Sequence, residues 1–478
     1  MKTVNRQQKS PTSAIGDRPQ ADDSPIVVLA NRLPIQSSAE GWSVSPGGLV
    51  TALSPVLRTR GGTWVGWTGN PDEPVDSVEV GGIRCVGLPL SQSEIDHHYL
   101  GFCNETLWPL YHNSIRTPQY RRDWWRDYRQ VNQRFTDRVT EAAPSDATFW
   151  VHDYHLQLVP TMLRERGIQN KVSFFLHIPF PPVELFARLP WRESILHGLL
   201  GADIVALQTK RSADNFKAAA VEFANATQQG DVLVSRHGET RVVSAPISID
   251  TKEFERIARQ ASTKQKAREI RKTLGEPRVL ALGADRLDYT KGIDVRLQAF
   301  ETLFDTLPGL AESLVFVQIA VPSRESIGDY AAMRNDIELL AGRINGMFGE
   351  RHHMPVHYVY ESLSREDLVA YYLACDVMLV TPLVDGMNLV AKEFVASRVD
   401  EQGVLLLSEF AGAADELEGA LLVNPFDVDR VASQISRALS MEPTQAESRM
   451  RKLRGSVLEH DVYLWTQQAL GEMPERPI

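Results

Sequence analysis

The chain has 478 residues, too many for one hydrophobic core, so two domains are expected. Hydrophobic residues make up 43% and charged residues 23% of the sequence, proportions that are typical of soluble globular proteins. The formal net charge of −10 argues against a nucleic acid or an anionic membrane as a partner.

The cysteines and the hydropathy pattern bear on the cellular compartment. Cys85, Cys103 and Cys375 stand far apart without the spacing of metal ligands, as expected of reduced thiols in a cytoplasmic enzyme. No apolar stretch of the sequence is long enough to span a bilayer, and no signal-peptide core occurs near Met1. We therefore predict a cytoplasmic protein. Residues 1–24 are polar and cannot bury enough surface to fold, so we expect a disordered tail there.

The first 250 residues alternate between apolar runs and helical patterns, which is typical of a parallel, doubly wound α/β sheet. Gly47 and Gly48 precede a helical pattern, where paired glycines let a phosphate approach a helix N-terminus; a simple tight turn fits equally well. No GxGxxG sequence accompanies them, so we do not expect a nicotinamide cofactor. The strands are expected at residues 26–30, 63–67, 149–156, 173–181 and 201–208.

Polar side chains end two of these strands. His152, Asp153 and His155 close the strand at 149–156, and His177 follows the strand core at 173–181. Metal ligation is one interpretation, but no further His or Cys cluster supplies the remaining ligands, so we predict no metal. Earlier in the chain, the segment Tyr99 to Trp125 is rich in aromatic residues. We expect most of them in the core and a minority in the wall of a sugar site.

A second alternation of strands and helices begins after residue 250, where we place a domain boundary. A long charged helix is expected from Thr251 to about Leu274. The strands that follow are expected at residues 279–283, 314–320, 356–360, 377–381, 404–408 and 421–424.

The loop after the strand at 279–283 carries Arg286 and Lys291 ahead of Gly292 and another helical pattern. Loops at the carboxyl ends of strands bind ligands in open α/β sheets. Two cations next to a helix N-terminus suit a diphosphate. Taken alone, they could equally be a solvated Arg and Lys that pair with Asp285 or Asp288.

A second loop follows the strand at 377–381 and leads from Asp385 into a helix near Asn388. Its backbone amides would face the same crevice. Glu393 lies one to two turns into that helix, where a carboxylate can bind the vicinal diol of a ribose. Capping of the helix by Asp385 is the alternative. A further motif, Gly342 to Gly346, brings Arg343 into consideration, with a structural ion pair to a carboxylate such as Glu338 as the alternative.

Together these motifs resemble the bacterial trehalose-6-phosphate synthase family over about residues 26–465. The family consists of retaining glycosyltransferases with two Rossmann-like domains facing across a deep cleft, the GT-B type. The resemblance therefore implies an acceptor domain at residues 25–250 and a nucleotide-sugar donor domain at 251–455. A C-terminal helix within 456–478 would pack back on the first domain. The motifs are NRLP, SPGGLV, WVGW, LWPLYH, HDYH, FFLHIPFPP, RLDYTKG, GRING, TPLVDGMNLVAKE and SEFAGA.

The resemblance also implies roles for individual residues. Arg286 and Lys291 would hold the donor diphosphate, with Gly48 approaching from the facing domain and Glu393 binding the ribose. His177 and Asp385 would contact the transferred glucose near the backbone amides of Asn388, Leu389 and Val390. The acceptor phosphate would meet Arg32, Tyr99 and Arg343, and the acceptor sugar would meet Trp64, Trp108 and Asp153.

The implied reaction moves glucose from a nucleoside-diphosphate glucose, with UDP-glucose the expected donor, to glucose 6-phosphate. The product would be α,α-trehalose 6-phosphate, formed in the first step of trehalose biosynthesis. No cofactor is expected, and a homo-oligomer is left open. Two alternatives remain: a synthase that glucosylates glycerol 3-phosphate, and an inactive sensor of nucleotide sugars. The sequence does not indicate whether the donor base is uracil, guanine or adenine.

Overall fold

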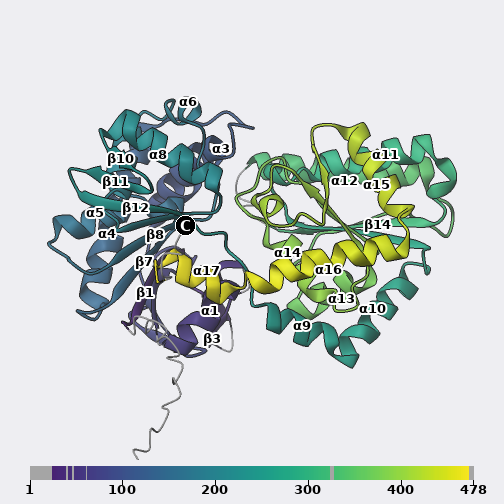
Figure 1. Ribbon diagram of the computed structural model, residues 1–478, viewed down its shortest axis with the longest axis horizontal. Helices are drawn as coiled ribbons and strands as arrows, with labels where there is room; N and C mark the ends of the chain where they lie inside the picture. The colour runs from purple at the N-terminus through teal and green to yellow at the C-terminus, as the bar shows by residue number, and fades with distance from the viewer. Residues whose placement is uncertain (1–23, 39–40, 46–47, 61, 323–327, 473–478) are drawn as a thin grey trace, which may run out of the picture.

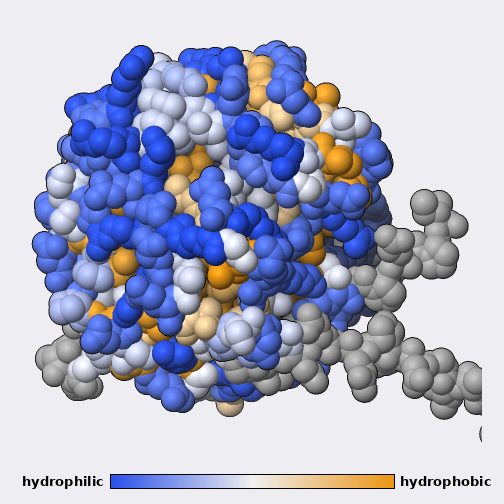
Figure 2. All heavy atoms as spheres, turned by 90° about the vertical axis from the view of Figure 1, so that its left-hand side faces the viewer, coloured by the Kyte–Doolittle hydropathy of each residue, from blue (hydrophilic) through white to orange (hydrophobic). Residues whose placement is uncertain are grey.

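The computed structural model describes residues 24–38, 41–45, 48–60, 62–322 and 328–472. Nearly all of the tail predicted at residues 1–24 therefore lies outside the described residues. The chain forms two lobes, each built around one large sheet (Figure 1). Hydrophilic side chains cover most of the outer face of the first lobe (Figure 2). Within the described ranges no helix is long and apolar enough to cross a membrane.

The first lobe contains a ten-stranded sheet whose central strands are parallel and whose two edges are antiparallel hairpins. The central strand β1 pairs in parallel with β7 and β4, so that Val28 lies opposite Trp150 on one side and Trp64 on the other. In spatial order the strands are β10 (Thr227–Gln229), β11 (Val232–Ser235), β12 (Gly238–Ser244), β9 (Ile204–Leu207), β8 (Val172–Leu176), β7 (Thr148–His152), β1 (Ile26–Arg32), β4 (Gly62–Trp67), β6 (Ile83–Gly87) and β5 (Val78–Val80).

Helices cover both faces of this sheet, as expected for a buried parallel sheet. The aromatic segment after Tyr99 lies in a π-helix and the helices that follow it, and most of its rings are buried, as predicted. The helices and the small ribbon of this lobe are α1 (Gly48–Arg60), α2 (Gln92–Glu94), the π-helix η1 (Ile95–Leu107), α3 (Trp108–Tyr111), α4 (Arg122–Ala142), η2 (Tyr154–Leu156), α5 (Val159–Glu165), α6 (Val183–Phe186), α7 (Arg192–Leu199), α8 (Lys210–Ala224), β2 (Ile35–Ser38) and β3 (Gly41–Val44).

The second lobe contains a six-stranded, fully parallel sheet. In spatial order its strands are β15 (Val356–Val359), β14 (Leu314–Val321), β13 (Val279–Arg286), β16 (Val377–Val380), β17 (Val404–Ser408) and β18 (Leu421–Val423). Its helices are α9 (Thr251–Arg259), α10 (Ala261–Thr273), η3 (Tyr289–Lys291), α11 (Ile293–Thr306), η4 (Pro308–Leu310), α12 (Gly328–Phe348), α13 (Arg365–Ala374), α14 (Leu389–Ser397), η5 (Gly412–Asp415), α15 (Val428–Leu439) and α16 (Pro443–Glu459).

The strands predicted at 149–156 and 173–181 are shorter and end at His152 and Leu176, and two further details differ from the prediction. The helix expected from Thr251 to about Leu274 is two helices, because Gln260 adopts an extended backbone with ψ 138° and interrupts the hydrogen-bond ladder. Strand β13 does not stop at Gly283 but continues to Arg286, because its parallel pairing with β14 persists up to Val321. The second difference places Arg286 on the end of the strand itself.

Each sheet has a point where the direction of chain progression reverses. In the first sheet it lies between β1 and β7, and in the second between β13 and β16. The loops at the carboxyl ends of such neighbouring strands diverge to opposite faces and leave a crevice between them, where ligands bind in this class of fold. The chain order therefore indicates one candidate crevice in each lobe.

The chain leaves the second lobe through α16, and the last helix of the described residues, α17 (Val462–Ala469), packs on the first lobe (Figure 1, yellow). Trp465 is 1% exposed and packs against Trp150 and Phe175, with ring centroids 5.1 Å from each. Ser173 donates a hydrogen bond to the carbonyl oxygen of Ala469 at 2.7 Å. The helix thus covers the face of the first sheet that Trp150 faces.

We expect Trp465→Ala to destabilise the fold by about 3–5 kcal/mol, because truncating a buried Trp loses its apolar contacts and leaves a cavity. The measurement is the midpoint of thermal unfolding. Tyr463→Ala on the same helix is the matched control, since Tyr463 is 40% exposed and its loss should cost less than about 0.5 kcal/mol. Equal shifts in the two variants would show that the helix does not stabilise the lobe in this way.

Candidate active site

The carboxyl ends of the two sheets line one cleft of about 730 Å³. Strands β1, β7 and β8 contribute residues from the first lobe, and β13 and the loop after β16 contribute from the second. The structure brings together the following predicted residues: Arg32, Trp64, Tyr99, Trp108, Asp153, His177, Arg286, Lys291, Asp385, Asn388, Leu389, Val390 and Glu393.

The closest approach of the two lobes in this region needs a glycine. A Cβ built on Gly386 would lie 2.3 Å from the carbonyl oxygen of His177, which is closer than two non-bonded atoms can approach. Gly386 therefore allows the loop after β16 to touch the end of β8 directly. This contact places Asp385 beside the polar residues of the first lobe.

Lys291 and Asp385 form the main ion pair of the cleft. The ammonium nitrogen lies 2.5 Å from a carboxylate oxygen, and the two side chains are only 10% and 14% exposed. Burial by itself would raise the pKa of Asp385, but Lys291, together with His112 and Asn388, outweighs it and lowers that pKa. A fixed cation and a fixed carboxylate are therefore held in a water-poor site.

Asn388 connects this pair to the following helix. Its side chain caps α14 by accepting a hydrogen bond from the backbone N–H of Ala391 at 3.3 Å, and it donates to Asp385 at 3.2 Å. Its φ of 81° is unusual for a residue with a side chain and indicates a constrained backbone. Asn388, and not Asp385, therefore caps helix α14. The N-terminal N–H groups of α14, at Leu389 and Val390, lie at the cleft.

Glu393 lies farther along α14 and accepts a hydrogen bond from the hydroxyl of Tyr372 at 3.0 Å. Burial raises the pKa of Glu393. Its carboxylate lines the cleft, which fits the position that the sequence predicts for a ribose ligand.

Arg286, at the end of β13, reaches across the cleft. Its guanidinium carbon lies 5.6 Å from the ring centroid of Trp108, which belongs to the other lobe. Arg116 and Tyr289 make a second contact of this kind between the lobes, at 4.5 Å. Cationic side chains of either lobe thus stack on aromatic rings of the other.

Arg32 is held at the end of β1 by aromatic neighbours. Its guanidinium carbon lies 4.7 Å above the ring of Trp67, and Trp64 donates its indole N–H to the carbonyl oxygen of Arg32 at 3.0 Å. Tyr99 packs edge-on against Trp67 at 5.8 Å. An arginine with a fixed, stacked guanidinium can present its donors to a phosphate.

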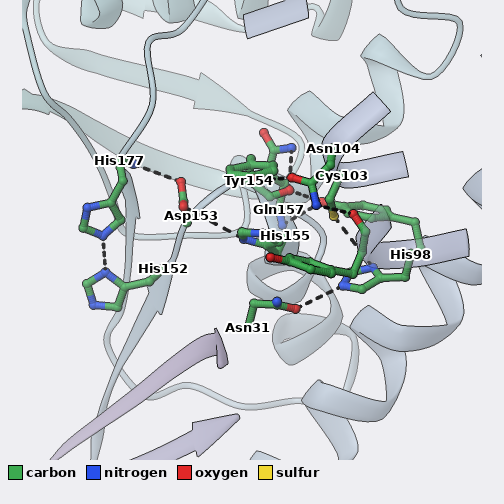
Figure 3. Close-up of polar contacts among 12 residues, drawn as sticks. Asn31, His98, Cys103, Asn104, His152, Asp153, Tyr154, His155, Gln157 and His177 are labelled. Carbon is green, nitrogen blue, oxygen red and sulfur yellow. Dashed lines mark hydrogen bonds and ion pairs between the residues drawn. The ribbon is translucent and has the colours of Figure 1, made fainter. Parts of the chain in front are cut away.

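Asp153 adopts a strained backbone at the end of β7, with φ 74° and ψ 170°. Strain in a non-glycine residue persists where the surrounding structure enforces it, and it occurs often at functional sites. The carboxylate of Asp153 accepts a hydrogen bond from the backbone N–H of His177 at 3.2 Å and faces His155 at 3.9 Å (Figure 3). The strain therefore fixes a carboxylate at the cleft.

Arg343 lies outside this group, whereas Gly48 is next to it in the chain, since Leu49 and Val50 line the cleft. Arg343 lies within α12, ahead of β15, where its side chain is 57% exposed and pairs with Glu301 of α11. The expected alternative partner, Glu338, pairs instead with Arg334. Arg343 therefore lies outside the residues that line the cleft, and its contact with the acceptor phosphate stays a prediction. Gly48 begins α1, and residues 46–47 of its motif lie outside the described residues.

Residues without an assigned role also line the cleft, among them His112 and His152. His112 donates a hydrogen bond from Nδ1 to the carbonyl oxygen of Trp108 at 2.7 Å. Burial lowers the pKa of His112 to about 4. In the sequence, His152 stands out at a polar strand end beside Asp153, whereas nothing local separates His112 from an ordinary core residue. The electrostatic contact of His112 with Asp288, Lys291 and Asp385 of the other lobe arises only from the fold. Across the described residues no group of three His, Cys, Asp or Glu side chains could hold a metal ion.

Two Rossmann-like sheets face each other across one cleft, which is the architecture of glycosyltransferases of the GT-B type. The sequence profile described as glycosyltransferase family 20 matches residues 24–475. The chain belongs to this family.

Several proteins whose names state an activity are similar to this chain, and they agree with its membership of the family. The trehalose-6-phosphate synthase of Mycolicibacterium gilvum (strain PYR-GCK) is 47% identical, and the match covers 97% of this chain and 96% of that protein. The α,α-trehalose-phosphate synthase (UDP-forming) of Burkholderia xenovorans, solved with glucose-6-phosphate, has a TM-score of 0.88 and 33% identity, covering 94% and 99% of the two chains. The E. coli protein bound with UDP-2-fluoro glucose has a TM-score of 0.87 and 34% identity, covering 95% and 100%. The predicted GT-B fold is thereby confirmed.

We expect Asp385→Asn and Lys291→Met each to destabilise the fold by about 3 kcal/mol, because each leaves one member of a buried ion pair without its partner. The double variant should lose less than the sum of the two. Since the pKa of Asp385 is lowered by folding, its contribution is present above its unfolded value near pH 4 and is lost as the pH falls through the folded value.

The measurement is thermal unfolding at neutral pH and on acidification. Lys210→Met is the matched control, since Lys210 and Asp214 form an exposed pair of the kind that contributes little. Additive losses in the double variant would show that the two cleft residues are not energetically coupled.

Proposed function

We propose that the protein transfers glucose from UDP-glucose to glucose 6-phosphate with retention of configuration and releases α,α-trehalose 6-phosphate and UDP. The observation that carries the proposal is the single cleft, where Arg286 and Lys291 of one lobe face Arg32 and an aromatic wall of the other. In this proposal the cationic side chains of each lobe bind one phosphate group of the substrates, and the sugars lie between them. The high identity to trehalose-6-phosphate synthases across nearly the whole chain supports the same activity.

We assign the donor to the second lobe. Arg286 and Lys291 would bind the diphosphate, and their positive charge would stabilise the negative charge that develops on the leaving UDP. The N-terminal N–H groups of α14 lie beside them and favour the same anion. Glu393 would accept hydrogen bonds from the ribose hydroxyls. Gly48 would approach the donor from the facing lobe.

We assign the acceptor to the first lobe. Arg32, with Tyr99 beside it, would bind the phosphate of glucose 6-phosphate, while Trp64, Trp108 and Asp153 line the sugar site. His177 and Asp385 would contact the glucose that is transferred. Within this assignment residues 25–250 are an acceptor domain and residues 251–455 a donor domain, with α17, in the segment 456–478, joining the two.

The chemistry follows from these placements. Retention through a covalent intermediate needs a carboxylate nucleophile beside the anomeric carbon. Lys291 pairs with Asp385 and the backbone N–H of His177 binds Asp153, and no carboxylate is clearly placed for that role. We therefore propose a front-face path. The bond from the anomeric carbon to the phosphate oxygen breaks, the bond to the acceptor hydroxyl oxygen forms on the same face, and the leaving phosphate oxygen takes the hydroxyl proton.

Purified protein incubated with UDP-, GDP- or ADP-glucose and with either glucose 6-phosphate or glycerol 3-phosphate tests the proposal. Proton NMR of the product with UDP-glucose and glucose 6-phosphate should show two α-anomeric protons of a 1,1-linked disaccharide. Transfer to glycerol 3-phosphate alone would favour the glucosylglycerol alternative. Tight nucleotide-sugar binding without turnover would favour a sensor. The three cysteines, all within the described residues, are buried and form no disulfide, which supports a cytoplasmic location.

We expect Arg286→Ala to lower kcat by roughly 10- to 100-fold, because a charge-assisted hydrogen bond to the transition state is worth about 1.5–3 kcal/mol. The measurement is the initial rate of UDP release at saturating substrates. Arg278→Ala is the control, because Arg278 is exposed at the opposite end of the same sheet. An unchanged kcat in folded Arg286→Ala would remove Arg286 from the donor site.

We expect Arg32→Leu to lower kcat/KM for glucose 6-phosphate at least about tenfold and to reduce its preference over free glucose, since the phosphate contact supplies that preference. Binding of UDP should stay within about twofold of wild type. Arg343→Leu is the matched control and should keep the preference, because Arg343 pairs with Glu301 on α11. Loss of the preference in Arg343→Leu, but not in Arg32→Leu, would reverse the acceptor assignment.

A further inference from the structure

His152 is the last residue of β7, and its fully buried side chain lies against the ring of His177 in the cleft wall (Figure 3). The two rings are stacked, with centroids 5.2 Å apart and planes at 26°. Nδ1 of His152 lies 2.9 Å from Nε2 of His177, which is a hydrogen-bond distance. His152 is therefore the direct partner of a residue assigned to the transferred glucose.

One of these two nitrogens must carry the proton that they share. Burial lowers the pKa of His177 to about 3 and that of His152 well below its ordinary value, so both rings are neutral. A neutral imidazole has one N–H and one bare nitrogen. If His152 donates from Nδ1, its Nε2 is bare and His177 carries its own proton on Nδ1. If His177 donates from Nε2, His152 must carry a proton on Nε2.

The surroundings of His152 distinguish these two arrangements. Its Nε2 is buried, and so are the indole N–H groups of Trp150 and Trp465; none of the three has a hydrogen-bond partner in the described part of the chain. The three rings pack together, with the centroid of Trp150 4.7 Å from His152 and 5.1 Å from Trp465. An indole can only donate. A third N–H would therefore add another buried donor without a partner to the two indoles, whereas a bare nitrogen adds none, and buried unpaired N–H groups are rare in proteins.

We propose that His152 is a positioning residue that donates its Nδ1–H to Nε2 of His177 and thereby fixes His177 as the Nδ1–H tautomer. His177 then presents a hydrogen-bond donor, not an acceptor, to a hydroxyl oxygen of the transferred glucose. This inference rests on the proposed function only in assigning that sugar to His177. The tautomer itself follows from the packing.

The proposal also gives α17 a part in the cleft. Trp465 lies 6.5 Å from the ring of His152 and 6.4 Å from that of His177, measured between centroids. Helix α17 thus supplies one of the two indoles beside His152. With the ring orientation fixed in advance, His177 meets the donor sugar without reorganising.

The first test compares two substitutions at one site. In His152→Asn the side-chain N–H₂ occupies the place of Nδ1–H, whereas His152→Leu has no donor. We expect His152→Leu to lower kcat with UDP-glucose about tenfold, the effect of one lost hydrogen bond. We expect His152→Asn to stay within about threefold of wild type. The Kd for UDP, which lacks the glucose, should be unchanged in both. Equal losses in the two variants would overturn the proposal.

The second test separates positioning from a merely structural role. In a His177→Ala background, His152→Leu should cost no further activity, because His152 acts only through His177. The same loss in both backgrounds would show that His152 supports the lobe and not the ring of His177.

The third test reads the tautomer directly and needs no turnover. Wild-type protein labelled with ¹⁵N-histidine should show His177, assigned by its absence in His177→Ala, with a protonated Nδ1 and a bare Nε2. A protonated Nε2 would overturn the proposal whether or not the enzyme transfers glucose. If the tautomer is as stated but wild-type protein forms no disaccharide, the proposed function fails and the positioning of His177 stands.

Discussion

Because a side chain at Gly386 would collide with the carbonyl oxygen of His177, the loop after β16 and the end of β8 can meet only through bare backbone. The rest of the cleft depends on this contact. It brings the carboxyl ends of the parallel strands of both sheets to one cleft, so that Arg286 and Lys291 face the aromatic wall around Arg32. In each sheet these residues stand at the reversal of strand order, where the fold leaves room for a ligand.

The electrostatics of the cleft are set before any substrate binds. Lys291 is held against Asp385 in a site with little water, and Asn388 holds the same carboxylate while capping α14. Asp153 and Asn388, on opposite sides, both have strained backbones. Such strain is maintained by the surrounding packing and keeps polar groups where they would otherwise relax. Fixed charges of this kind stabilise a developing charge with little reorganisation, which is the main demand of glucosyl transfer from a diphosphate.

Most of the fold and much of the candidate site could be predicted from sequence, because both depend on strand ends. Apolar runs such as 279–283 and 377–381 locate buried parallel strands, and polar residues that follow them lie at the cleft. No local signal places the motif from Gly342 to Gly346 inside the long helix α12, on whose surface Arg343 pairs with Glu301. The break at Gln260 could not be predicted either, because the charged helical pattern of the sequence continues through it. His152 and His112 matter through partners from distant segments, which no local pattern reveals.

The central claim is that one cleft holds the donor diphosphate on the second lobe and the acceptor phosphate on the first. A crystal structure with UDP-2-fluoro glucose and glucose 6-phosphate tests it most directly. The diphosphate should lie within hydrogen-bond distance of Arg286 and Lys291, and the acceptor phosphate should lie within that distance of Arg32. A diphosphate bound away from Arg286 and Lys291, or an acceptor phosphate bound at Arg343 on the outer surface of α12, would contradict the account.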